Sequence, residues 1–199
     1  ASIIRKTDHI QCIDTDDVSL TARKVICTAP APQTATLVAD DFHDLAATAS
    51  YAAYAPCLTV MLGLADDEVL PKIPVKSPKH NIGWAVSETA RPAATHHRPA
   101  LTIQADAAWS AVHKDDTTDS IIRQLIEKYQ LATGCQISSV LHAHAHRWLY
   151  AKVTTPSPVD AIICQKNLAI AGDWLGGARI EHAFTSGQRA FLALNQTHA

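Results

Sequence analysis

The chain has 199 residues, of which 47% are hydrophobic, so it can bury a core in one large domain or two small ones. It carries 17 Lys and Arg residues against 19 Asp and Glu residues, and no basic stripe interleaved with aromatic residues occurs, which argues against a nucleic-acid partner. No apolar run approaches the ~20 residues of a membrane span, and residues 1–8 lack the features of a signal peptide. We therefore expect no membrane partner and a cytoplasmic location.

The cysteines are odd in number and widely spaced, and none forms a C-x-x-C pair. They are Cys12, Cys27, Cys57, Cys135 and Cys164. This pattern predicts buried thiols in a reducing compartment rather than a disulfide framework.

The first half of the chain shows strand signals, then a helix, then a strand. Short alternating runs between residues 2 and 28, with an Asp-rich turn, predict an antiparallel β-meander. The apolar run at 25–27, closed by Pro30, predicts a buried strand that stops at a loop. Residues 33–54 favour a helix, and residues 55–64 a strand.

The second half alternates between the two periods. Residues 81–88 and 100–106 predict paired strands, joined by the polar segment 89–99. Helices are expected at 106–114 and 115–134. In the second, residues 116–118 offer N-caps, and Gly134 suits a C-cap. Residues 138–153 predict a strand of period two, and 167–174 a strand that leads into a helix at 178–195.

The final strand and helix form a unit that could bind a ligand. Apolar residues at helical spacing predict that the last helix packs one face on a sheet: Ile180, Ala183, Phe184, Gly187, Ala190, Phe191 and Leu194. At its start, the N–H groups of residues 178–181 should lie at the open end of the strand, where the helix dipole favours electron-rich oxygen. Asp173 would repel a phosphate but can accept hydrogen bonds from hydroxyls, or it can simply cap the helix.

The stretch "AGDWLGGARIEHAFTSGQRA", residues 171–190, resembles the second flavin-contacting motif of the flavin amine oxidase superfamily, in particular its renalase-like branch. Three further stretches are similar to the same family and follow its order along the chain: "VICTAPAPQ" at 25–33, "YAPCLTVML" at 54–62 and "HRWLYA" at 146–151. The resemblance implies FAD as the cofactor.

The resemblance also implies roles for residues around this motif. Gly172 and Asp173 would lie by the ribityl and phosphate region, and Trp174 near the flavin edge. The N–H groups around Arg179, Ile180 and Glu181 would face the pyrimidine carbonyl of the flavin. His182 stands where relatives carry Gly, and we expect it to face outward. The expected cofactor-binding set is Gly172, Asp173, Trp174, Gly176, Gly177, Arg179, Ile180 and Glu181.

The dinucleotide turn of this family is absent, because none of the seven glycines forms G-x-G-x-x-G. The sequence therefore resembles the carboxyl-terminal two thirds of such an enzyme. Either a second polypeptide or upstream segment supplies the first Rossmann unit, or the chain has lost its cofactor site. We expect the chain alone to carry little FAD, and the strand at 168–171 to lack a neighbour.

The substrate pocket is expected to be aromatic. Trp84 and Trp148, with His146, are the candidates for lining this pocket above the flavin, although each Trp could instead pack in a core. No catalytic acid and base pair is evident. Hydride transfer from a dihydronicotinamide to flavin needs no general base, and an amine would equally suit a dry aromatic slot.

A metal site is the rival hypothesis from a different class. His142, His144 and His146 alternate and could project from one strand face toward zinc or another transition metal. No Asp or Glu stands nearby in sequence to orient the rings. The "THHRP" segment at 95–99 is expected to be a solvated loop.

The sequence thus predicts an α/β protein with a mixed or antiparallel sheet, flanking helices and an incomplete Rossmann-type domain. Residues 1–32 and 166–199 would form a partial FAD-binding domain, and residues 33–165 a substrate-binding domain. The leading function is a FAD-dependent oxidoreductase of renalase or amine-oxidase type, or its substrate-domain portion, which passes electrons from a dihydronicotinamide or amine to flavin and then to oxygen. The alternative is a non-catalytic interaction protein that kept the fold without the cofactor site.

Overall fold

The computed structural model describes residues 1–90 and 98–196, and the predicted histidine loop at 95–99 lies largely outside them. The chain divides into two compact units, one formed by residues 1–54 and 152–199 (unit 1) and one by residues 55–151 (unit 2). The chain passes between the units twice, within strands β5 (Ala53–Leu64) and β9 (Val140–Thr155). The assignment of a flavin domain and a substrate domain to parts of the chain stays a prediction.

Unit 1 begins with the expected meander, in which β1 (Ser2–Arg5), β2 (Ile10–Ile13) and β3 (Ser19–Ala22) pair in antiparallel order. A second sheet has the order β10-β11-β4. In it, β4 (Val25–Cys27) pairs in parallel with β11 (Leu168–Ile170), which pairs antiparallel with β10 (Cys164–Gln165). Residues far apart in sequence therefore build this sheet.

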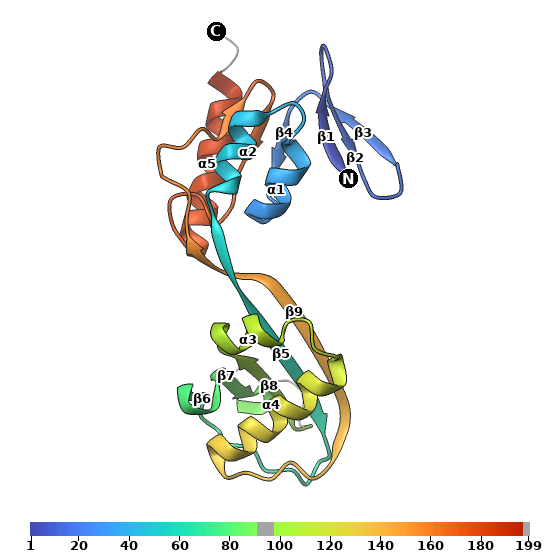
Figure 1. Cartoon of the computed structure of the whole chain (residues 1–199), viewed down its shortest axis with the longest axis vertical. Coiled ribbons are helices and arrows are strands. Elements are labelled where there is room, and N and C mark those ends of the chain that lie inside the picture. Colours follow the sequence, from blue (N-terminus) through green and yellow to red (C-terminus); the bar gives the residue numbers. More distant parts are fainter. Residues whose placement is uncertain (91–97, 197–199) are drawn as a thin grey trace. The chain divides into compact units, whose positions relative to one another are not determined.

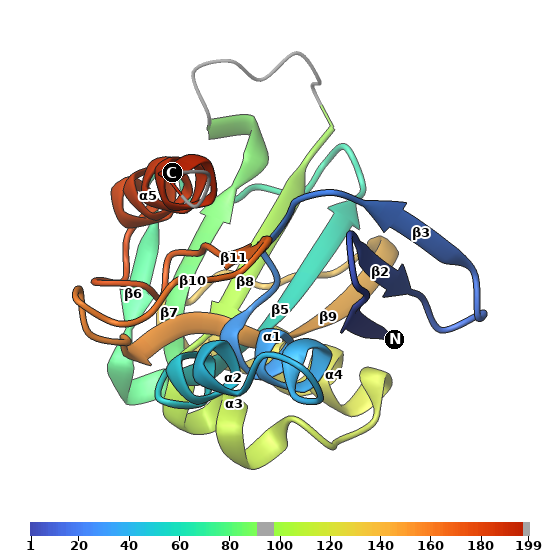
Figure 2. The same cartoon turned by 90° about the horizontal axis from the view of Figure 1, so that it is seen from above.

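Helices α1 (Ala31–Val38) and α2 (His43–Ser50) pack side by side in unit 1 (Figure 2). The sequence pattern predicted one helix over 33–54, and the break at 39–42 corrects it. The reason is tertiary, because the Phe42 side chain is fully buried in the core. Next to it, the Asp41 carboxylate accepts a hydrogen bond of 2.8 Å from the Arg5 backbone N–H. These two anchors turn the chain between the helices.

The strand β11 is the centre of unit 1. All three of its residues are fully buried. Leu168 and Ile170 join the larger core with α1 and α2, whereas Ala169 packs with Ala190 and Leu194 of α5 (Ile180–Gln196). The expectation that this strand lacks a neighbour was wrong, since β10 and β4 flank it. Among the described residues it is β4 that has a strand partner on one side only.

Unit 2 is built on a five-stranded sheet of order β6-β7-β8-β5-β9. Strands β6 (Val75–Ser77), β7 (Ile82–Ser87) and β8 (Ala100–Ala105) pair antiparallel, and β8 pairs antiparallel with β5. The 3-10 turns η1 (Pro78–His80) and η2 (Glu88–Ala90) flank β7. Helices α3 (Ala107–His113) and α4 (Thr118–Thr133) cover one face of the sheet (Figure 1).

Helix α4 follows its sequence signals closely. Thr117 is the N-cap, and its hydroxyl accepts a hydrogen bond from the Ser120 backbone N–H at 3.3 Å. Gly134 ends the helix in the left-handed region, with φ of 74°, where a residue with a Cβ would be strained. Ile121, Leu125 and Tyr129 are buried against the sheet.

The predicted fold class, a mixed α/β protein with antiparallel sheets and flanking helices, is confirmed by the two units together.

Helix α5 packs differently from the prediction. Its buried residues are Ser186, Ala190 and Leu194, whereas Phe184 and Phe191 are 68% and 60% exposed. Only part of the predicted apolar stripe, Ala190 and Leu194, is therefore buried. The small side chains let α5 approach Ala169 and Ala171 closely, so the larger residues stay on the outer face. None of the helices in the described part of the chain is long and apolar enough to span a bilayer.

The five cysteines are free thiols, as expected, but only Cys27 is buried. The other four are half-buried. Burial raises the pKa of Cys12, Cys57 and Cys164, so these thiols are less reactive at neutral pH than an ordinary cysteine.

Candidate functional site

The candidate site lies where β11 ends and α5 begins, within unit 1. Ser186 of α5 ties the two elements together, because its hydroxyl both accepts from the Gly172 N–H and lies 2.9 Å from the Gly172 carbonyl oxygen. The carboxyl ends of the parallel strands β4 and β11 lie side by side at this point. This is the edge where open α/β sheets bind ligands.

Gly172 is required by its neighbour Trp174. A Cβ at Gly172 would overlap with the Trp174 indole ring. That ring is only 1% exposed, and its Nε1–H donates to the Ala29 carbonyl at 3.3 Å. Trp174 therefore packs in the core of unit 1. The burial of its ring does not support the predicted position at the edge of a flavin.

The two glycines that follow, Gly176 and Gly177, are needed for different reasons. Gly176 adopts a left-handed φ of 79°, and its N–H donates to the Ser157 carbonyl at 3.0 Å. A Cβ at Gly177 would overlap with the imidazole ring of His182. The prediction that His182 faces outward was wrong, because the ring lies over Gly177 and its Nδ1 is buried without a hydrogen-bond partner among the described residues.

The start of α5 offers backbone donors. The first hydrogen bonds at this end run from the N–H groups of His182 and Ala183 to the Arg179 carbonyl, at 3.0 and 3.2 Å. Within the described chain, the N–H groups of residues 178–181 have no recorded acceptor, and residues 178–181 are exposed. Such free N–H groups attract electron-rich oxygen atoms.

Asp173 precedes the first of these donors by five positions, at the end of β11, and is half-buried. Its carboxylate makes no hydrogen bond or ion pair within the part of the chain that the structure describes, so it does not cap α5. The Tyr54 hydroxyl is close enough to Asp173 for the carboxylate charge to affect its pKa. Burial raises the pKa of Tyr54 first, and the negative charge of Asp173 raises this pKa further.

These residues fit one end of a flavin cofactor, with one obstruction. The free carboxylate of Asp173 suits hydroxyl groups, and the N–H groups of residues 178–181 suit a carbonyl oxygen that gains charge on reduction. The His182 ring occupies the space over Gly177, so a flavin that contacts Gly177 requires this side chain to rotate. The unpartnered Nδ1 means that no hydrogen bond within the described chain opposes the rotation.

The three residues expected in a substrate pocket share one face of the unit 2 sheet. Trp84 pairs with Gln104, which pairs with Thr59, on the face away from α3 and α4. On β9, Ala145 is buried toward the helices, so the alternate residues His146 and Trp148 point to the opposite face. Trp84 and Trp148 are 41% and 52% exposed, so neither packs in a core.

The two tryptophans do not touch. β8 and β5 lie between β7 and β9, so three strand spacings of about 4.8 Å separate the two strands that carry them by roughly 14 Å. His146 packs against Trp148 with ring centroids 4.2 Å apart. The face is thus a broad aromatic surface with two separate aromatic positions, and the sequence pattern placed all three residues on it.

The histidine strand gives the metal hypothesis no support. The rings of His144 and His146 have centroids 6.4 Å apart, and no group of three His, Cys, Asp or Glu side chains among residues 1–90 and 98–196 is arranged to hold a metal. A Cβ at Gly63 would lie 3.5 Å from the Cβ of His142, so His142 lies beside Gly63 of the neighbouring strand β5.

Two functional features escaped the sequence reasoning. Ser186 was given no role from the sequence, whereas its hydroxyl connects the end of β11 to α5. Tyr54 approaches Asp173, although 119 positions separate the two residues. No local pattern signals either contact, because the first depends on how α5 packs back on β11 and the second on the meeting of distant parts of the chain.

No family model matches the sequence. Among the solved structures that share the fold are two oxidases. A protein from Exiguobacterium sp. 255-15, assigned as a protoporphyrinogen oxidase, superposes with a TM-score of 0.70 at 13% identity, over 100% of this chain and 46% of that one. Cyclohexylamine oxidase from Brevibacterium oxydans IH-35A superposes with a TM-score of 0.65 at 14% identity, over 98% of this chain and 47% of that one.

The similarity establishes that the chain shares its fold with part of each of these two structures. The chain spans about half the length of each of these two structures.

Proposed function

We propose that this chain contributes part of the flavin site and the substrate surface of a FAD-dependent oxidoreductase of amine-oxidase type. The observation that carries the proposal is that the Asp173 carboxylate and the N–H groups of residues 178–181, which follow the carboxyl end of β11, have no hydrogen-bond partner among the described residues. The shared fold with two oxidases supports it. Residues 1–32 and 166–199 would belong to the flavin-binding part, and residues 33–165 to the substrate-binding part.

In this proposal, a bound flavin would supply the redox chemistry by accepting a hydride and passing electrons to oxygen. Asp173 would hold its ribityl hydroxyls, and the N–H groups of Arg179, Ile180 and Glu181 would stabilise negative charge at its pyrimidine carbonyl. The substrate, a dihydronicotinamide as in the renalase-like branch or an amine, would lie on the face that carries Trp84, His146 and Trp148. Flat aromatic side chains bind planar or cationic groups by stacking.

The proposal includes a partner: a second polypeptide or upstream segment that carries the G-x-G-x-x-G turn. Two observations support it. The outer edge of β4 has no strand partner among the described residues, and Ile26 at this edge is 37% exposed. The outer face of α5, with Phe184, Phe191 and Leu192, forms a shallow apolar groove of about 600 Å³. A Rossmann unit would supply both a strand and an apolar helix face.

Flavin binding tests the proposal. FAD is titrated into the chain alone and into the chain together with a G-x-G-x-x-G segment, with the flavin absorbance as the readout. We expect weak binding alone and tight binding in the assembly. Asp173→Ala should weaken binding in the assembly by about 1.5–3 kcal/mol, because a charged hydrogen-bond acceptor is lost. Asp160→Ala, an exposed carboxylate of the same unit, is the control. Equal affinity in the Asp173 and Asp160 variants would contradict the assigned role.

A second candidate function rests on His182. Because its ring covers Gly177 and the Trp174 ring is buried, a non-catalytic protein that kept this fold would show the same arrangement. The variant His182→Gly separates the two. If it raises FAD affinity in the assembly, the site is a flavin site with a movable cover. If neither form binds flavin, the interaction protein is the better description.

A further inference from the structure

Unit 1 has a polar pocket at the opposite end of β11 from Asp173. Its volume is about 580 Å³, and its lining residues come from the β1–β2 turn and from the turn that precedes β11. They are Arg5, Lys6, Thr7, His9, Ile10, Lys166 and Asn167. Pockets of this size hold small-molecule ligands.

The charge of this pocket is strongly positive. Arg5, Lys6 and Lys166 line it, and no Asp or Glu does so among the described residues. None of these three cations makes a recorded ion pair within residues 1–90 and 98–196. The Asp41 carboxylate bonds the backbone N–H of Arg5 and not its guanidinium. His9 is paired outside the lining set, since its Nδ1 lies 2.7 Å from the Asp8 carboxylate.

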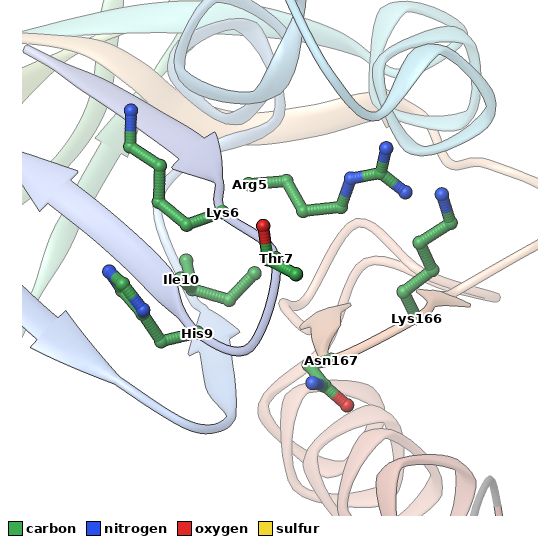
Figure 3. A pocket seen from close by; sticks show the side chains of 7 residues that line it. All are labelled: Arg5, Lys6, Thr7, His9, Ile10, Lys166 and Asn167. Carbon is green, nitrogen blue, oxygen red and sulfur yellow. The ribbon is translucent and has the colours of Figure 1, made fainter.

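Arg5 and Lys166 are brought together by the fold, although 161 positions separate them. Figure 3 shows the charged ends of both side chains directed toward one another, with the Thr7 hydroxyl on the same side and the Asn167 amide turned away from them. Both side chains are exposed, and neither has an ion-pair partner among the described residues, so an anion between them would pair with both.

The backbone at Lys166 adds an independent observation. Lys166 has a φ of 57°, in the left-handed region that favours Gly or Asn. The turn is fixed in this position, because the carbonyl of Asn167 accepts a hydrogen bond of 2.9 Å from the N–H of Val25. A lysine at a position where glycine is the lower-energy choice indicates that the side chain has a use.

We propose that this pocket binds the phosphate groups of a small phosphorylated molecule. The guanidinium of Arg5 presents donors in a planar fork that matches two phosphate oxygens, and Lys166 supplies a compact charge on the other side. The Thr7 hydroxyl adds an uncharged donor. The volume accommodates a diphosphate together with an organic group such as a nucleoside. The site does not depend on the proposed flavin chemistry, because Lys166 and Asn167 precede β11 and Asp173 follows it.

Calorimetric titration of the full chain with inorganic pyrophosphate, ADP and adenosine tests the proposal. We expect pyrophosphate and ADP to bind and adenosine not to bind, with affinity that falls as salt rises. Tighter binding of ADP than of pyrophosphate would identify an organic phosphate as the ligand, and equal binding would mean that the phosphates alone are recognised. Binding of adenosine as tight as ADP, or binding of neither phosphate compound, would overturn the proposal.

Substitutions locate the binding to the pocket. Arg5→Ala and Lys166→Ala should each weaken pyrophosphate binding about tenfold or more, because each removes a charged donor. Lys152→Ala, an exposed lysine of the same unit outside the pocket, is the matched control and should change affinity less than twofold or so. Asp173→Ala should leave pyrophosphate affinity unchanged, which separates this site from the flavin site.

Lys166→Gly is the most discriminating variant. It removes the charge and also relieves the left-handed backbone, so it should lose pyrophosphate binding while it melts no earlier than the parent chain. Loss of binding can then not be attributed to unfolding. Retained binding in this variant, or an equal loss in Lys152→Ala, would show that the anion is held elsewhere.

Discussion

The two units bury their sheets in different ways. In unit 2, α3 and α4 cover one face of the sheet and the other face presents Trp84, His146 and Trp148. In unit 1, β11 is only three residues long and is buried on both faces, between the α1 and α2 core and helix α5. A half-covered sheet leaves room for a surface that contacts ligands along the strands. A sheet buried on both faces leaves only the ends of its strands for this purpose.

This difference explains where the candidate sites lie. Both sites of unit 1 are at the ends of β11, with Asp173 after it and Lys166 before it. The proposed substrate surface of unit 2 is instead a sheet face. Changes that unpack β11 should therefore be costly, whereas changes on the open face of unit 2 should be tolerated.

Trp174→Ala should have the largest effect on stability. The ring is 1% exposed and packs over Gly172, so its removal leaves a cavity and should cost about 3–5 kcal/mol of the free energy of unfolding. Urea unfolding followed by circular dichroism measures it. Trp148→Ala on the open face of unit 2 is the comparison and should cost within about 0.5 kcal/mol. Similar losses in both variants would mean that the two sheets do not differ as described.

The two sides of α5 offer a finer test. Leu194 is 4% exposed against β11, and Leu194→Ala should cost about 2–5 kcal/mol. Phe191 is 60% exposed, and Phe191→Ala should change the free energy of unfolding by about 0.5 kcal/mol or less in the chain alone. The same unfolding experiment compares them. A large loss in the free energy of unfolding for Phe191→Ala would mean that the apolar outer face of α5 is buried in solution, against a surface outside the described structure.

Unit 2 was predictable where its signals are local. The helix over 115–134 followed from its caps and its apolar spacing, and strands 81–88 and 100–106 from their alternation. Unit 1 was predictable only in its elements. The position of β11 between β10 and β4, and the burial of Ser186 in place of Phe184, depend on how a short strand of small residues accepts a helix. Periodicity gives the apolar stripe of a helix but not which part of it the rest of the fold covers.

The same reasoning applies to the candidate sites. The Gly-Asp strand end and the start of α5 were found from the sequence, because their order along the chain is local. The contact of His182 with Gly177 and the convergence of Arg5 with Lys166 were not found. The first depends on the side-chain rotamer and the second on long-range pairing.

The N-cap of α4 should have a moderate effect confined to unit 2. Thr117→Ala removes the acceptor for the Ser120 N–H and should cost about 1 kcal/mol. Thr118→Ala, at the first helical position, is the matched control and should cost less. Thermal unfolding of the two variants gives the comparison. If the two variants have the same melting temperature, the hydroxyl of Thr117 has no capping role.

Tyr129 should produce the smallest effect at neutral pH and a measurable one at high pH. Burial raises the pKa of its hydroxyl from 10.0 to about 12. Between these values the unfolded chain loses this proton and the folded chain keeps it, so the contribution is complete below pH 10 and is lost as the pH rises toward 12. Tyr129→Phe should flatten this alkaline fall in stability. Tyr51→Phe, on an exposed tyrosine, should leave it unchanged.

The pairing of β4 with β11 also sets a delay in biosynthesis. Val25 pairs with Leu168, which follows it 143 positions later. At a synthesis rate of roughly 5–20 residues per second, β4 waits on the order of ten seconds for its partner. Unit 2 lies entirely within that interval and can fold while it passes. The nascent meander, β4 and α1 meanwhile expose apolar surface on the ribosome, so the early part of unit 1 is where a chaperone would act.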